Sequence, residues 1–122
     1  MTSAILLVSH VEGLAQGVVD LLEEVAKDVE IIQAAGLDDG GIGTSFERIQ
    51  AAIEASQADQ IYAFYDLGSA KMNLEMVQEM SDKKITIYDT AFVEGAYNAA
   101  ALTQAGLNQE EMEKQLKDLV VK

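Results

Sequence analysis

The feature that most constrains the fold of this chain is a regular alternation of short apolar runs with segments of helical periodicity. Four runs are rich in strand-forming residues, at residues 4–9, 29–34, 60–67 and 84–89. Apolar residues recur at helical spacing over residues 11–27, 44–56, 70–80, 91–104 and 109–121. Strands that alternate with helices form a parallel sheet with helices on both faces, so the sequence predicts an α/β fold.

The predicted strand order is 2-1-3-4, as in a doubly wound sheet whose crossovers are all right-handed. Strands one and three are then neighbours, and their helices leave toward opposite faces. Open sheets of this kind bind ligands at such a switch point, outside the carboxyl ends of the strands. His10 follows the first apolar run and Asp66 lies near the end of the third, so we expect both side chains at one crevice. The fourth strand is expected at an edge of the sheet.

Composition limits the partners and the compartment. We expect the 122 residues to form one domain, residues 1–122. With 21 acidic against 8 basic residues the formal net charge is −13, which argues against nucleic acid and anionic lipid as partners. No apolar stretch approaches the roughly 20 residues of a membrane span. No basic leader is seen and cysteine is absent, which fits the cytoplasm.

His10 is the only histidine in the chain and the first candidate for chemistry. Residues 9–12 read S-x-x-E, the pattern of a capping box, so Ser9 and Glu12 are predicted to cap the first helix. His10 then lies in the first helical turn, where an anion on its ring meets unpaired amides and the positive end of the helix dipole. By position alone, a lone histidine at a strand–helix junction is more often an ordinary cap or turn residue.

Two further helix starts are predicted at the same end of the sheet. The loop GLDDGGIGTS supplies glycines and a second capping box from Thr44 to Glu47. After the third strand, DLGSA places Ser69 as a helix cap and leaves the amides around Gly68 accessible. Together these helix starts form a phosphate cradle that needs no cations. This matters because Arg48 is the only arginine, interpreted as a surface residue of its helix.

Other readings of these residues are weaker. The glycine-rich loop lacks the G-K-[ST] of nucleotide hydrolases, and no G-x-S-x-G elbow supports hydrolysis by Ser9, His10 and Asp66. Asp38 and Asp39 are interpreted as solvated turn residues, so no metal site is expected. The methionines are interpreted as packing residues.

The motifs taken in order resemble a known family. They are VSHVEGLAQGV, AAGLDDGGIGTSFERIQAAIE, YDLGSAKMNLEMV and AFVEGAYNAA. They are similar to the phosphoryl-carrier (DhaM-type) subunit of bacterial phosphoenolpyruvate-dependent dihydroxyacetone kinase, a phosphotransferase. That subunit resembles the mannose-type IIA domains of the phosphotransferase system. The match runs from Ala4 to about Ala101, and residues 1–122 are expected to be one stand-alone domain of this kind.

The resemblance implies a role for each candidate residue. His10 accepts a phosphoryl group from the carrier HPr and passes it to ADP held by a partner kinase subunit, so this chain binds no cofactor of its own. Asp66 orients the histidine. Independently of the resemblance, a neutral imidazole is a competent nucleophile, and the expected place of His10 in the first helical turn suggests its outward nitrogen, Nε2, as the attacking atom. Phosphate contacts map onto Gly43-Thr44 and Gly68-Ser69. Related domains imply a homodimer.

Two other functions remain open at this stage. A mannose-type sugar-transport IIA domain uses the same chemistry but passes the phosphate to a transporter subunit. A non-catalytic module could bind an anion in the same pocket. The A-A-G-x-D-D, I-G-T and D-x-G-S-A motifs favour the dihydroxyacetone kinase carrier over the transport domain.

Overall fold

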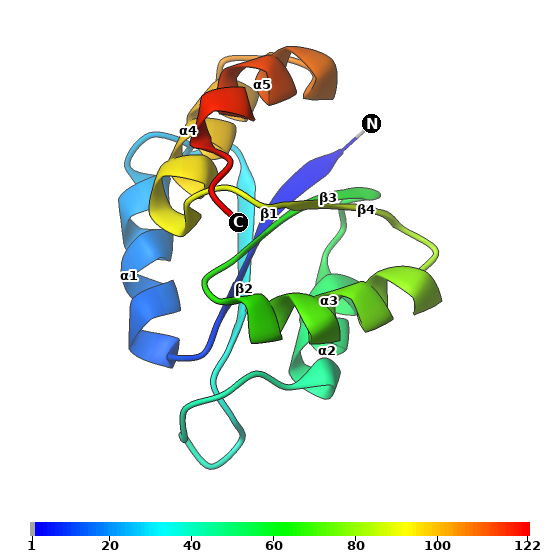
Figure 1. Cartoon of the computed structure of the whole chain (residues 1–122). Helices are drawn as coiled ribbons and strands as arrows, with labels where there is room; N and C mark the ends of the chain where they lie inside the picture. Colours follow the sequence, from blue (N-terminus) through cyan, green and yellow to red (C-terminus); the bar gives the residue numbers. More distant parts are fainter. Residues whose placement is uncertain (1) are drawn as a thin grey trace.

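The computed structural model describes residues 2–122, in which strands and helices alternate as predicted (Figure 1). The four strands are β1 (Ser3–Ser9), β2 (Glu30–Ala35), β3 (Gln60–Tyr65) and β4 (Lys84–Tyr88). The helices are α1 (Glu12–Glu23), α2 (Phe46–Ala55), α3 (Gly68–Met80), α4 (Phe92–Gln104) and α5 (Gln109–Leu116), followed by a short 3₁₀ helix, Lys117–Leu119.

The strands form one parallel sheet in the order β2-β1-β3-β4, which confirms the prediction and places β4 at an edge. β1 lies at the centre, where Val8 pairs with Ala34 of β2 on one side and with Tyr65 of β3 on the other. The apolar run Ala4–Val8 is completely buried because helices cover both faces of the sheet.

Alternate residues along the strands pack into two apolar layers. Leu6, Val8 and Ala63 face α2 and α3, whereas Ile5, Leu7 and Phe64 face α1, α4 and α5. Figure 1 shows α1 and α4 on one side of the sheet and α2 and α3 on the other. The carboxyl ends of β1 and β3 thus lie side by side between the two helical layers, at the switch point predicted from the sequence.

The last predicted helix, residues 109–121, ends earlier than expected. α5 stops at Leu116, and after the 3₁₀ turn the chain runs back along the end of β4. Thr90 and Val120 form an antiparallel bridge, and the Val121 N–H donates to the Asp89 carbonyl at 3.1 Å. This pairing satisfies backbone groups just beyond the edge strand. No helix within residues 2–122 combines the length and the apolar character needed to span a membrane.

Candidate active site at the carboxyl ends of β1 and β3

The side chains of His10 and Asp66 meet where β1 and β3 end. Because Val8 pairs with Tyr65, the residues just beyond the two strands are brought together. The Nδ1 atom of His10 lies 2.9 Å from Oδ1 of Asp66, and the His10 backbone N–H donates to Oδ2 at 2.9 Å. The two residues expected at the switch point are therefore in direct contact there.

Asp66 is held as a carboxylate by a set of donors. The Ser9 hydroxyl donates to Oδ2 at 2.9 Å and the Leu67 N–H donates to Oδ1 at 2.7 Å, in addition to the two contacts with His10. Burial by itself raises the pKa of Asp66, but these hydrogen bonds outweigh it and lower the pKa below its usual value. An ionised Asp66 accepts a hydrogen bond from Nδ1–H, which keeps the proton on Nδ1 and leaves the lone pair of the ring on Nε2.

The Nε2 atom of His10 faces Ser69, whose Oγ lies 2.7 Å away. With the proton on Nδ1, the Ser69 hydroxyl donates to this nitrogen. The His10 side chain is 17% exposed, and Ser69, the partner of Nε2, is itself exposed. Ser69 was expected to cap its helix, and this is wrong: the N-cap of α3 is Leu67, without a side-chain cap. Ser69 instead lies in the first turn of α3.

The predicted capping box of α1 is also wrong. The N-cap of α1 is Val11, again without a side-chain cap, so His10 precedes the helix and does not lie in its first turn. Ser9 still belongs to β1, where it pairs with Ala35, and its hydroxyl bonds to Asp66 and to the Val11 backbone. Because the strand continues through Ser9, the backbone needs two more residues to turn into the helix.

Glu12, the other half of that predicted box, binds Arg48 instead. Nη2 of Arg48 donates to Oε1 of Glu12 at 3.2 Å, and Nη1 of Arg48 donates to Oδ1 of Asp38 at 3.2 Å. Arg48 thus ties the start of α1 to the glycine-rich loop and to α2. With both sides of its guanidinium engaged by carboxylates, it is a loop-holding residue rather than a free phosphate ligand in this structure.

The glycine-rich loop after β2 lies against the backbone of His10. The Gly43 N–H donates to the His10 carbonyl at 2.9 Å, so this amide fixes the histidine backbone. Gly36 and Gly43 have φ angles of 70° and 153°, which favour glycine. A Cβ atom added to Gly36 would lie only 2.8 Å from Cγ of Glu12, so the close approach of the loop to α1 also favours glycine there.

The second predicted capping box is shifted by one residue. Ser45, not Thr44, is the N-cap of α2 and accepts from the Arg48 N–H. Thr44 is therefore free to bond elsewhere, and its Oγ1 accepts from Nδ2 of Asn73 at 2.9 Å. The sequence reasoning missed Asn73. Its spacing four residues after Ser69 puts it on the same face of α3, which is the signal that could have revealed it.

A second polar cluster, also missed, lies behind Asp66. The Tyr65 hydroxyl donates to Oδ1 of Asp89, and Nζ of Lys71 lies 2.9 Å from the same oxygen. Nζ of Lys122 lies 4.1 Å from the centre of the Tyr65 ring and donates to the Tyr65 carbonyl. Burial raises the pKa of Asp89, but its bonds to Tyr65 and Lys71 outweigh this and lower it. The cluster anchors the backbone directly before Asp66.

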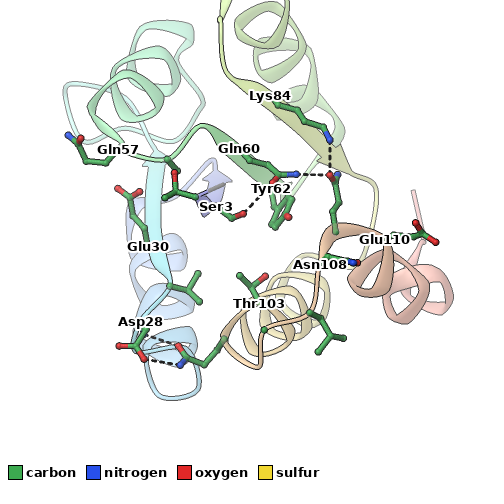
Figure 2. Close-up of a pocket in the computed structure, with 17 residues that line it drawn as sticks. Ser3, Asp28, Glu30, Gln57, Gln60, Tyr62, Lys84, Thr103, Asn108 and Glu110 are labelled. Atoms are coloured by element: carbon green, nitrogen blue, oxygen red, sulfur yellow. Dashed lines mark hydrogen bonds between the residues drawn. The ribbon is translucent and has the colours of Figure 1, made fainter.

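A wide cleft of about 840 Å³ lies at the other end of the sheet, around the first residues of the strands (Figure 2). Its polar side chains bond to one another: Gln60 Nε2 donates to Gln109 Oε1 at 2.6 Å, and Lys84 Nζ donates to the same oxygen at 2.9 Å. These bonds join α5 to the sheet. The candidate active site is at the opposite end, where Asp66 orients the ring of His10.

Comparison with known proteins agrees with this geometry. The family model described as "PTS system fructose IIA component" (EIIA-man) matches residues 4–113. The chain is 46% identical to the phosphotransferase subunit DhaM of the PTS-dependent dihydroxyacetone kinase of Lactococcus lactis, covering 99% of this chain and 98% of that protein. It is 45% identical to the phosphoryl donor subunit DhaM of PEP-dependent dihydroxyacetone kinase 1 of Listeria innocua, covering 97% of this chain and 95% of that protein.

Among solved structures, the protein of unknown function EF1359 matches with a TM-score of 0.88 and 26% identity, covering 100% of this chain and 98% of that one. The fold, the matched family model and the full-length relatives all agree. The chain belongs to the DhaM family, built on the mannose-type IIA domain of the phosphotransferase system.

Proposed function

We propose that this protein is a phosphohistidine carrier that takes a phosphoryl group from phospho-HPr onto Nε2 of His10 and passes it to ADP on the nucleotide-binding subunit of a dihydroxyacetone kinase. The observation that carries the proposal is the orientation of one ring: Asp66 holds Nδ1, while Nε2 points to the exposed side at Ser69. The names of the Lactococcus and Listeria relatives support this choice over the sugar-transport alternative.

In the first step the lone pair of Nε2 attacks phosphorus in line with the bond that breaks. The N–P bond to the donor histidine opens, and the donor ring keeps that electron pair. Ser69 turns its hydroxyl from Nε2 to a phosphoryl oxygen. The ring of His10 now carries a positive charge, which the adjacent Asp66 carboxylate balances. No net proton enters or leaves, because Nδ1 keeps its hydrogen throughout.

In the second step a β-phosphate oxygen of ADP attacks the same phosphorus atom. A P–O bond forms, the bond to Nε2 breaks, and the neutral ring is restored with its proton on Nδ1. The carrier thereby returns to its starting state and ATP is formed on the partner. Asp66 orients the ring in both directions of this exchange, which makes it a positioning residue.

The site is expected to stabilise a bound phosphoryl group only weakly. The first-turn amides of α3, at Gly68 and Ser69, have no acceptor within their own helix and carry the positive end of its dipole. Such an interaction contributes about 0.3–1 kcal/mol. The Thr44 hydroxyl can add a donor, since in the structure it accepts from Asn73. A bidentate arginine would bind phosphate more strongly, so this arrangement suits a group that must leave.

Incubation with phosphoenolpyruvate, Enzyme I and HPr tests the first step. The wild-type protein should gain one acid-labile phosphate, and His10→Gln should gain none while keeping its thermal unfolding midpoint. Because His10 is the only histidine, any phosphohistidine on the chain must be there. An acid-labile phosphate on the His10→Gln variant overturns the assignment.

The acceptor is tested separately. Purified phosphorylated protein is mixed either with a dihydroxyacetone kinase core and ADP or with a mannose-type transporter subunit. We expect rapid loss of phosphate and formation of ATP only in the first mixture. Transfer to the transporter subunit alone favours the transport alternative. We further propose that the carrier works in the cytoplasm as a homodimer, and sedimentation of the purified protein tests the latter.

A further inference from the structure

Asn73 is a half-buried polar residue of α3 whose side chain reaches the glycine-rich loop. Its Nδ2 atom donates to Oγ1 of Thr44 at 2.9 Å. Thr44 is the last residue of that loop before Ser45, the N-cap of α2. Figure 1 shows α2 and α3 on the same side of the sheet. The hydrogen bond therefore joins the end of the glycine-rich loop to α3.

Two separate contacts place this pair beside the histidine site. Thr44 follows Gly43, whose N–H donates to the His10 carbonyl at 2.9 Å. Asn73 follows Ser69 by four residues in α3, so the two side chains lie on one face of the helix, about 5–6 Å apart between their Cβ atoms. Ser69 in turn lies 2.7 Å from Nε2 of His10. The Thr44 hydroxyl is thus held between the loop that contacts the His10 backbone and the helix that contacts the His10 ring.

The hydrogen bond from Asn73 limits where Thr44 can donate. A hydroxyl group has one proton and two lone pairs, and an amide NH₂ group only donates. Thr44 therefore accepts from Asn73 and keeps its own proton for another acceptor. Within residues 2–122 the Thr44 side chain makes no other hydrogen bond. Ser69 differs, because its hydroxyl already donates to Nε2 when the ring carries no phosphoryl group.

We propose that Asn73 is a positioning residue, which directs the proton of the Thr44 hydroxyl to the phosphoryl group on Nε2 of His10. This inference rests on the proposed function. Thr44 keeps its proton throughout, so the bonds to phosphorus form and break as in the two transfer steps above. The hydrogen bond from Thr44 stabilises the negative charge on the phosphoryl oxygens during transfer. A donor that is already oriented needs no reorganisation at that moment.

A double-mutant cycle tests whether Asn73 acts through Thr44. In Asn73→Ala and in Thr44→Val, kcat for transfer from phospho-HPr should fall about tenfold or more, as expected when a hydrogen bond to a charged group is lost. KM should stay near its wild-type value, because the lost contact is to the transferring group. The double variant should be no slower than Thr44→Val. Thr44→Ser keeps the hydroxyl and should recover most of the loss. Losses that multiply in the double variant overturn the proposal.

Asn73→Asp separates this role from a merely structural one. An ionised carboxylate only accepts hydrogen bonds, so the bond to Thr44 survives with its direction reversed. The Thr44 proton is then no longer available to the phosphoryl group, and the variant should be at least as slow as Asn73→Ala. If Asn73 only ties the loop to α3, Asn73→Asp keeps a rate near that of wild type, and that result overturns the proposal.

Met72→Glu is the control for the negative charge that Asn73→Asp adds. Met72 is the neighbour of Asn73 in α3 and is 69% exposed. The expectation that the methionines pack in the core is wrong for Met72, Met76 and Met80, although Met112 is fully buried. With phosphoramidate, a small phosphoryl donor that needs no protein surface, phosphorylation of His10 is followed by ³¹P NMR. Met72→Glu should react within about twofold of wild type, whereas Asn73→Asp should be about tenfold slower.

The two donors also identify where an error lies. Asn73→Ala should be slowed alike with phosphoramidate and with phospho-HPr, because the Thr44 hydroxyl acts on the phosphoryl group and not on its donor. A loss confined to phospho-HPr means that Asn73 contacts the donor protein, which overturns the proposal. If wild-type protein takes phosphate from neither donor, the proposed function fails, whereas equal rates in wild type and Asn73→Ala defeat only the positioning role. The thermal unfolding midpoint of each variant, measured by circular dichroism, should stay above the assay temperature.

Discussion

At the scale of single residues, one carboxylate organises the site. Asp66 accepts hydrogen bonds from Ser9, from Leu67 and from both the backbone and the ring of His10. It thereby links the end of β1 to the end of β3 and fixes the tautomer of the His10 ring. Its lowered pKa makes this arrangement dependent on pH, because a protonated carboxyl group loses acceptor capacity and charge together.

Acid unfolding of Asp66→Asn measures this contribution. In an unfolded chain an aspartate titrates near pH 3.9. Since the folded pKa is lower, the stabilisation is complete above about pH 4 and is lost as the pH falls through the folded value. The variant should therefore lose less unfolding free energy than wild type over that acidic range, as measured by urea unfolding at several pH values.

Asp82→Asn is the control for that experiment, because it removes one acidic group at an exposed position. Equal slopes of stability against pH in wild type and Asp66→Asn count against the assigned role of the carboxylate. Transfer from phospho-HPr should also slow in Asp66→Asn, because the ring is no longer held in one tautomer.

At the scale of elements, small residues let α4 pack tightly against the sheet and against the turn that precedes the helix. Ala96, Ala99 and Ala100 are completely buried, and Gly95 faces the buried Thr90 at the end of β4. A Cβ atom on Gly95 would lie 1.9 Å from Oγ1 and 2.6 Å from Cβ of Thr90. The Thr90 hydroxyl, which has no hydrogen-bond partner within residues 2–122, occupies the space that glycine leaves.

Gly95→Ala should consequently destabilise the protein by about 1–3 kcal/mol, the usual cost of overpacking a core. Gly17→Ala is the matched control: it lies inside α1, and its Cβ meets nothing within 4 Å. Alanine is favoured over glycine in a helix, so this change should stabilise by about 0.5–1 kcal/mol. Urea unfolding of both variants measures the sign of each change in unfolding free energy. An unchanged unfolding free energy in Gly95→Ala would show that α4 can move away from Thr90.

At the scale of the whole molecule, charge repulsion opposes the fold. The net charge is −13, and the ion pairs of Arg48 and Lys114 lie on the surface, where such pairs contribute little. The dominant electrostatic effect is therefore repulsion among acidic side chains in the compact state. Salt screens that repulsion more than it weakens the few attractive pairs.

We expect the thermal unfolding midpoint to rise when NaCl is increased from about 10 mM to about 150 mM, as the Debye length shortens from about 30 Å to about 8 Å. Circular dichroism at constant pH measures it, with KCl as a check on ion-specific effects. A falling midpoint means that the attractive pairs outweigh the repulsion.

The sequence by itself determined the α/β fold of this protein and the order of its strands. Completely apolar runs such as Ala4–Val8 require a sheet covered on both faces, and the alternation with helices makes that sheet parallel. Once β1 and β3 are neighbours, the residues just beyond them must meet. The contact between His10 and Asp66 could therefore be predicted although 56 residues separate them.

Only the tertiary structure decided how the remaining side chains are used. Strand pairing continues through Ser9, so α1 begins later than predicted. The Ser9 side chain, predicted to cap the helix, donates a hydrogen bond to Asp66 instead. Likewise, α3 begins at Gly68, which puts Ser69 in its first turn, facing Nε2. Met76 stays exposed because no element covers that side of the helix within residues 2–122. Local pattern specifies which residues can cap or pack, but the neighbours that each one meets depend on how the elements come together.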